Sequence, residues 1–240
     1  MIELPNITFV SVDGRQSSNK NFHHYTEFGH LYWLIKYAEY ANKYFKFGRY
    51  LILTPDADKY KHDFIEFEKT VSFGYKGYSH FMIFGLKSHI TTDFCLVYQS
   101  DGSIINPSLW DNSFLNYDYI GAPWGLNAPI PKRFKAYRNY SCCVGNGGFS
   151  LRSKKLLDIG STIPFFNGNE DLFLLLKNKQ YLLDNGIKIP DCDFARKFSI
   201  EYPIDTNHTT ENTFGFHKPK YDDMTFLDSY RTKILTELNL

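Results

Sequence analysis

The sequence has no apolar run of the ~18 residues that a membrane-spanning helix needs, and its start lacks the basic stretch and hydrophobic core of a secretory signal. It also has no excess of one charge, because 27 Lys and Arg are balanced by 26 Asp and Glu, for a net charge of +1. Such a chain is not expected to attract nucleic acid or anionic lipid through its overall field. We expect a cytoplasmic protein without a transmembrane segment, peripheral to a membrane at most, that binds any anionic ligand through local chemistry.

Cysteine is scarce as well. The four cysteines, Cys95, Cys142, Cys143 and Cys192, form no repeated CxxC pattern. Adjacent Cys142 and Cys143 are poor partners for a simple disulfide, so cysteine usage predicts a reducing compartment. No pair of Cys and His residues has the spacing of zinc ligands, and a zinc site is therefore not expected.

Two nucleotide-binding fingerprints are missing. The sequence has neither the GxGxxG order of dinucleotide-binding proteins nor the GK[ST] ending of a phosphate loop, which weighs against a Rossmann dehydrogenase and a P-loop enzyme. The chain instead has VGNGGFSLR at 144–152, with three glycines within four positions. This pattern predicts a backbone that comes close to a ligand before it enters a strand. A glycine-rich hairpin turn is the alternative.

Strand and helix patterns alternate in the first half of the chain. The predicted strands lie at 7–12, 50–54 and 94–105, and the predicted helices at 30–45 and 78–90. The alternation indicates an α/β fold with a mixed, mostly parallel sheet flanked by helices. Apolar residues make up 43% of the chain, which is enough for the core of one domain that includes all 240 residues.

Proline and glycine punctuate the region that follows, where we expect a site or a lid more than a regular layer. A short strand is predicted at 117–120, and helices at 170–181 and 221–240. The basic segment KRFKAYR at 132–138 is either a solvated loop or a loop that binds phosphate or an acceptor.

Asp101 ends the apolar run FCLVYQSDGSII and is followed at once by Gly102. Ligands in open α/β sheets gather beyond the carboxyl ends of strands. A carboxylate there, beside a glycine that lets a ligand approach, suits an oxygen-ligated divalent ion that carries a diphosphate. An ordinary turn after a strand is the alternative interpretation.

Two further groups could carry chemistry. Glu170 and Asp171 stand in the first turn of a predicted helix, where acids complement the helix dipole but can also serve as a general base in a cleft. His217 could be a metal ligand and Lys218 a partner for phosphate, although a single histidine near the end of a chain is more often structural.

The order of the motifs resembles a known family. The segments are FCLVYQSDGSII at 94–105, YDYIGAPW at 117–124, VGNGGFSLR at 144–152, NEDLFL at 169–174, FSIE at 198–201 and GFHK at 215–218. Together they are similar to the family catalogued as a domain of unknown function, DUF5672, over roughly residues 48–220. The resemblance implies a single domain with the GT-A fold of nucleotide-diphosphosugar transferases, and therefore a glycosyltransferase.

The resemblance also implies where a cofactor binds. Asp101 stands where GT-A enzymes carry the acid of a metal-binding DxD motif, but Gln99 stands where the first acid of that motif would be. His217 matches the C-terminal histidine that often completes the metal or diphosphate site. The implied cofactor is a divalent cation, Mn²⁺ or Mg²⁺, with Lys218 as a second source of positive charge.

The remaining site residues follow in the same way. Gly147 and Gly148 match the glycine pair that lines the sugar site, and Asp171 matches the base, with Glu170 expected to orient the acceptor. Asp13, at the end of the first strand, is a candidate for contact with the nucleotide. Trp124 and Tyr119 could form a wall for sugar stacking, or Tyr119 could belong to the core.

The implied reaction moves a sugar from a nucleotide-diphosphate donor to a hydroxyl of a glycan or lipid-linked glycan, with metal assistance and inversion. The rival is a non-catalytic module that binds a nucleotide sugar or carbohydrate, which the incomplete DxD favours. A nucleotidyltransferase would need a glycine-rich, basic loop, of which Asp13-Gly14-Arg15 is a meagre version. A glycosidase fits less well, because Asp101 and Asp171 are better explained as metal ligand and base.

Overall fold

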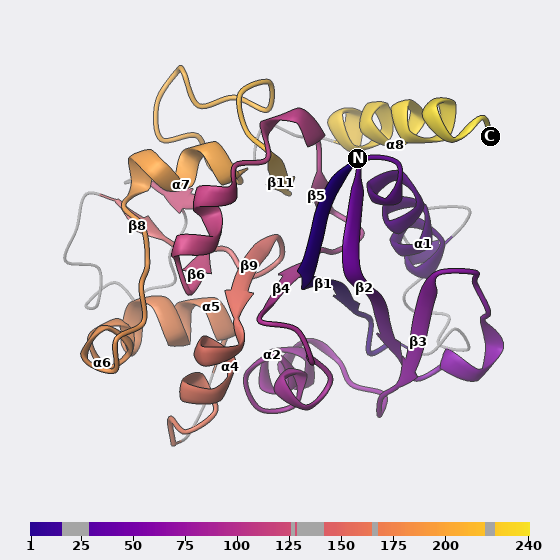
Figure 1. Cartoon of the computed structure of the whole chain (residues 1–240). Coiled ribbons are helices and arrows are strands. Elements are labelled where there is room, and N and C mark those ends of the chain that lie inside the picture. The colour runs from indigo at the N-terminus through magenta and orange to yellow at the C-terminus, as the bar shows by residue number, and fades with distance from the viewer. Residues whose placement is uncertain (16–28, 126–127, 129–141, 165–167, 219–223) are drawn as a thin grey trace.

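A six-stranded sheet forms the centre of the molecule (Figure 1). The computed structural model describes residues 1–15, 29–125, 128, 142–164, 168–218 and 224–240. The strand order is β3-β2-β1-β4-β9-β6. The strands are β1 Ile2–Val12, β2 Phe45–Thr54, β3 Ile65–Lys69, β4 Phe94–Val97, β6 Tyr119–Ile120 and β9 Ser150–Ser153.

The sheet is mixed and mostly parallel, which confirms the expected fold class. Four adjacent strands run parallel to one another, in the order β3, β2, β1 and β4. The next strand, β9, pairs antiparallel with both β4 and β6. Alternate residues of β1 enter two different cores. Ile7 and Phe9 belong to the larger one, and Val10 and Val12 to the smaller one. Because both faces of the sheet are covered, residues 7–12 of β1 are all buried, including the polar residues Thr8 and Ser11.

Helices form the outer layers (Figure 1). α1 Gly29–Asn42 and α8 Met224–Leu238 contribute to the larger core, whereas α2 Tyr75–Phe84 and α4 Lys154–Gly160 contribute to the smaller one. α5 Glu170–Leu172, α6 Lys179–Asp184 and α7 Cys192–Phe198 lie at the end of the sheet that β6 forms. Within the described residues, none of the helices has the length and apolar character needed to cross a membrane.

The predicted helix at 170–181 is interrupted. After α5 the chain forms a π-helical turn at Phe173–Lys177, and α6 follows. The carbonyl of Phe173 accepts hydrogen bonds from the backbone N–H of Asn178, five residues later, and from its side-chain amide. Residues 172–176 are five consecutive buried apolar residues. The first four residues of the π-helical turn are therefore buried on all sides.

The predicted strand at 94–105 is also divided. β4 ends at Val97, and β5 Gly102–Ile104 belongs to a second sheet with the order β10-β11-β5. Between them Gln99 and Gly102 exchange both backbone hydrogen bonds, so Ser100 and Asp101 occupy the corner of a tight turn. β10 Ser199–Ile200 and β11 Gly215–His217 complete the second sheet, and β7 Pro123–Trp124 pairs with β8 Cys143–Val144 in a third.

The cysteine prediction is wrong in one respect. Cys142 forms a disulfide with Cys192, and the two are 50 residues apart in the chain, whereas Cys95 and Cys143 are free and buried. The bond joins the strand that leads into the glycine-rich segment to the start of α7. Neither the adjacent pair nor the CxxC spacing indicates this bond, because the fold brings the two cysteines together from distant parts of the chain. Cysteine usage therefore no longer indicates a reducing compartment.

Candidate active site

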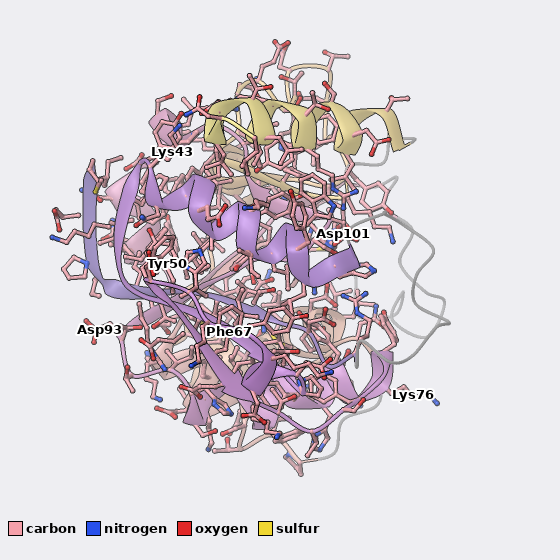
Figure 2. All side chains as sticks on the ribbon, turned by 90° about the vertical axis from the view of Figure 1, so that its right-hand side faces the viewer. Lys43, Tyr50, Phe67, Lys76, Asp93 and Asp101 are labelled. Atoms are coloured by element: carbon pink, nitrogen blue, oxygen red, sulfur yellow. A yellow bond between two sulfur atoms is a disulfide. The ribbon has the colours of Figure 1, made fainter. Side chains whose placement is uncertain are left out.

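The turn that carries Asp101 lies at the carboxyl edge of the parallel strands. Figure 2 shows Asp101 on one side of the molecule, and Asp93 and Lys43, which precede β4 and β2, on the other. The turn is held from several directions. The carbonyl of Ser100 accepts from the Tyr37 hydroxyl at 3.2 Å and from Nη2 of Arg231 at 3.1 Å, and the carbonyl of Asp101 accepts from the Lys218 N–H at 2.8 Å.

Asp101 and His217 lie side by side, as the sequence predicts. Nε2 of His217 is 3.6 Å from Oδ1 of Asp101, whose side chain is 36% exposed. Burial would raise the pKa of Asp101, but His217, with help from the charge of Lys218, outweighs burial and holds this pKa well below its usual range. Burial would lower the pKa of His217, but the carboxylates of Asp101 and Glu201 raise it to about 10. Without another cation in the site, His217 therefore carries the positive charge next to Asp101.

Gln99 brings an oxygen to the same place. Its Oε1 is 3.1 Å from Nε2 of His217, and its Nε2 donates to the Tyr78 hydroxyl at 2.6 Å. Gln99, two residues before Asp101, thus brings an amide oxygen to the same nitrogen of His217 that faces the Asp101 carboxylate. Among the described residues, no three His, Cys, Asp or Glu side chains are grouped so that they could hold a metal by themselves. One carboxylate, one amide oxygen and one imidazole nitrogen do converge.

The glycine-rich segment packs directly against His217. A Cβ at Gly148 would lie 2.2 Å from Nε2 of His217, so only glycine fits there. Asn146 has a positive φ of 64°, a conformation that asparagine tolerates, and its Oδ1 accepts from the Gly148 N–H at 3.0 Å. The Tyr119 hydroxyl is within 3.0 Å of the carbonyls of Gly145 and Asn146. The local sequence thus fixes a loop that touches His217, and Tyr119 is a buried support of that loop.

Asp171 lies on the other side of this loop. Its Oδ2 accepts from the Gly147 N–H at 3.1 Å, and its Oδ1 accepts from the Leu172 N–H at 2.7 Å. Burial is the largest cause that raises the pKa of Asp171, to about 7, and the charge of Glu170 is the second, against the opposing effect of both backbone hydrogen bonds. A half-buried carboxyl that titrates close to neutral pH can accept a proton from a substrate hydroxyl.

Glu170 does not occupy the position expected of a residue that orients an acceptor. It is buried, and its Oε1 accepts from Nη2 of Arg152 at 3.1 Å. Arg152, which is 1% exposed, also donates to the carbonyl of Gly147 at 3.1 Å. A Cβ at Gly147 would lie 1.9 Å from Oε1 of Glu170, so this ion pair underlies the loop. We therefore propose that Glu170 positions the loop and does not contact an acceptor.

Trp124 is not an exposed wall for sugar stacking, because it is 6% exposed. Its Nε1 donates to Oε2 of Glu201 at 2.6 Å, and a Cβ at Gly145 would lie 2.1 Å from its ring. The other oxygen of Glu201, Oε1, is 3.6 Å from Nδ1 of His217. Trp124 is therefore a buried residue that holds Glu201 beside His217.

Asp13 and Lys218 lie at the same edge. Asp13 is buried at the end of β1, and its Oδ1 accepts from Nε of Arg15 at 2.6 Å. Nδ1 of His30 is 2.7 Å from Oγ of Ser100 at this edge. Burial, and then the charge of Arg15, lower the pKa of His30, and the carboxylates of Asp13 and Asp101 oppose them. Lys218 is exposed and has a positive φ of 44°. The basic segment at 132–138 lies outside the described residues.

Three residues of this site were not predicted from the sequence. Glu201 ends FSIE and Arg152 ends VGNGGFSLR, two of the segments that resemble the family, so their positions in the motifs were the available signal. Gln99 was noted in the sequence only because it stands in place of the first acid of a DxD motif. None of the three could be placed without the fold, because Gln99 follows β4 and Arg152 lies in β9 of the main sheet, whereas Glu201 follows β10 of the second sheet.

Three solved structures resemble this one in fold. The first is the bifunctional IspDF from Campylobacter jejuni, with 11% identity and a TM-score of 0.49 over 77% of this chain, which spans 48% of that protein. The second is a glycosyltransferase involved in glycosylation of the major capsid of PBCV-1, with 13% identity and a TM-score of 0.48, covering 94% of this chain and 98% of the other. The third is the galactosyltransferase LgtC in complex with donor and acceptor sugar analogues, with 13% identity and a TM-score of 0.48, covering 96% and 95%. Similarity at this level does not extend to activity.

Among curated proteins, none matches the sequence significantly. A family model does match residues 61–217, a span that includes Gln99, Asp101, the glycine-rich loop, Asp171 and His217. That family carries the description "protein of unknown function". The chain belongs to this family, DUF5672.

Proposed function

We propose that the chain is a glycosyltransferase that moves a sugar from a nucleotide-diphosphate donor to a hydroxyl of a glycan or lipid-linked glycan. One observation carries the proposal. The backbone N–H of Gly147 donates a hydrogen bond to the Asp171 carboxylate. The next residue, Gly148, packs against the ring of His217, which lies beside Asp101. A substrate lying along this backbone would have its leaving group at one end and its acceptor hydroxyl at the other.

The residues divide the reaction between them. The acceptor oxygen forms a bond to the anomeric carbon as the bond from that carbon to the diphosphate oxygen breaks, and the nucleoside diphosphate leaves with the electron pair. Asp171 takes the proton of the acceptor hydroxyl. Attack from the face opposite the leaving group gives inversion at the anomeric centre. The absence of side chains at Gly147 and Gly148 lets Glu170 and His217 pack against the loop, so these glycines shape the backbone along which the sugar would lie.

The cation end of the site suits a divalent ion. Asp101, Gln99 and His217 would hold it, with phosphate and water oxygens as the other ligands. The ion would neutralise the charge that develops on the diphosphate as the glycosidic bond breaks. Lys218, whose N–H binds the carbonyl of Asp101, is placed to add positive charge at the same end.

One observation favours a second candidate, a binding module without turnover. Gln99 offers an oxygen but no negative charge, so the site has one acid fewer than a DxD motif. Such a site would hold a cation more weakly. The module would bind the nucleotide sugar but would neither hydrolyse nor transfer it.

Replacing Asp101 by Ala should remove the effect of metal on nucleotide binding. In the wild type, Mn²⁺ should tighten the binding of a nucleoside diphosphate by roughly 5- to 150-fold, the usual range of coupling between two ligands. Calorimetric titration with UDP, GDP, ADP, CDP and dTDP, in Mn²⁺ and in excess chelator, measures this coupling. Asp93→Ala, on the opposite side of the molecule, is the matched control (Figure 2). Equal affinity in metal and in chelator would contradict the metal assignment.

A further inference from the structure

Glu201 and Trp124 lie behind His217, on the side away from Asp101. Nδ1 of His217 is buried and has no hydrogen-bond partner among the described residues, and Oε1 of Glu201 faces it at 3.6 Å. The other carboxylate oxygen of Glu201 is fixed by the indole N–H of Trp124 at 2.6 Å. The side chains of both His217 and Glu201 are 15% exposed, so water competes little for these atoms.

We propose that Glu201 and Trp124 are positioning residues that keep a proton on Nδ1 of His217, so that Nε2 is the nitrogen that faces the substrate side and gives up its proton when a cation binds there. The inference deepens the proposed function and rests on it for the identity of the ligand that Nε2 meets. It assigns tasks to FSIE and to YDYIGAPW, the two family segments that the reaction scheme leaves unused.

The geometry restricts the ring from both sides. Gly148 lies against one part of the imidazole, and a Cβ at Gly102 would lie 2.8 Å from Cδ2 of His217. A ring packed between two glycine backbones has little room to turn over. Its orientation then depends on what each nitrogen meets, and Nδ1 meets a carboxylate while Nε2 meets Asp101 and the oxygen of Gln99.

Trp124 determines which atoms of Glu201 are free. Because the indole N–H occupies Oε2, the carboxylate cannot rotate away without losing a short hydrogen bond, and Oε1 remains directed at Nδ1. A carboxylate behind a histidine in this manner selects the tautomer and the orientation of the ring. The 3.6 Å separation is that of an ion pair, and such contacts commonly tighten when the substrate complex forms.

A pair of variants separates positioning from simple structural support. In Glu201→Gln the single amide oxygen can accept from Trp124, which turns the NH₂ group toward Nδ1 and favours the wrong tautomer. Adding Trp124→Phe removes the indole donor, so the amide oxygen is free to turn to Nδ1. The double variant should therefore recover what the Gln variant alone loses, although it carries one more change. A merely structural role predicts that the losses add.

Two readouts follow the ring. The first is the Nδ1–H resonance of His217 in protein labelled with ¹⁵N-histidine, assigned among the eight histidines by its loss in His217→Asn. We expect this resonance in the wild type, its loss in Glu201→Gln and its return in Glu201→Gln/Trp124→Phe. The second is Mn²⁺ affinity, which should fall roughly 10- to 100-fold in Glu201→Gln, the usual effect of changing a partner of a metal ligand. In the double variant about half of this loss, on a logarithmic scale, should be recovered.

Trp110→Phe is the matched control, because the N–H of Trp110 donates to Asn112 and not to Glu201. Melting temperatures of all variants exclude unfolding as the cause. An Nδ1–H resonance that persists in Glu201→Gln, or losses that add in the double variant, would overturn the inference. If the wild type binds no Mn²⁺ but the resonance follows the expected pattern, the positioning role holds and the metal part of the proposed function fails.

Discussion

Asp171→Asn is expected to lower sugar transfer roughly 100- to 10,000-fold, the usual contribution of a general base, while nucleotide binding persists. The amide cannot accept the acceptor proton. The two carboxylate oxygens of Asp171 accept from the N–H groups of Gly147 and Leu172. The asparagine amide has only one oxygen, so one of these two hydrogen bonds is lost. The measurement is kcat together with the Kd of the nucleoside diphosphate, with exposed Asp158→Asn as the control. Transfer at the wild-type rate would show that the base lies elsewhere.

The pH dependence of the wild type should point to the same group. A base works in its ionised form, and burial with the charge of Glu170 raises the pKa of Asp171 to about 7. The rate of sugar transfer should therefore rise as the pH increases through about 7 and then level off.

The free energy of unfolding should change in the opposite direction. Folding raises the pKa of Asp171, so its protonated form stabilises the folded state, and this stabilisation is lost as the pH rises through the folded pKa.

Arg152→Met is expected to destabilise the fold by about 3–5 kcal/mol, the usual cost of removing one partner of a buried ion pair. Glu170 would keep its charge in the core without Arg152, and the carbonyl of Gly147 would lose its donor. In a chain of this size the loss corresponds to a melting temperature lower by roughly 10 °C. Denaturant unfolding with thermal unfolding measures it.

The double variant Arg152→Met/Glu170→Met gives the control. Removing both charges should restore most of the stability, since paired buried charges can often be replaced by apolar side chains at little cost. Transfer should stay low, because the Gly147 carbonyl still lacks the guanidinium that holds the loop. If Arg152→Met alone were as stable and as active as the wild type, the ion pair would have no part in supporting the loop.

Periodicity predicted the elements that depend on local patterns. The strands around Val10 and Leu51 and the helix from residue 30 were found because buried strands and amphipathic helices leave clear spacing in a sequence. Asp101 and His217 were predicted as neighbours through the family resemblance, and the structure brings them together. Their roles as metal ligands stay predictions.

Burial and pairing across the fold could not be predicted in the same way. Trp124 and Glu170 are residue types that commonly face a ligand, and only their partners Glu201 and Arg152, distant in the sequence, show that they are enclosed. The Cys142–Cys192 disulfide likewise depends on where α7 begins in space. Each of these pairings is a tertiary contact without a periodic signal.

The most direct test of the proposed transferase is a mass-spectrometric assay of the wild-type chain with a panel of nucleotide-diphosphate sugars, mixed oligosaccharide acceptors and Mn²⁺. We predict that at least one donor is consumed, that the matching nucleoside diphosphate is released, and that Asp171→Asn suppresses both. Binding of a donor without consumption would favour the binding module. Folded protein that neither binds nor consumes any donor of the panel would contradict the account.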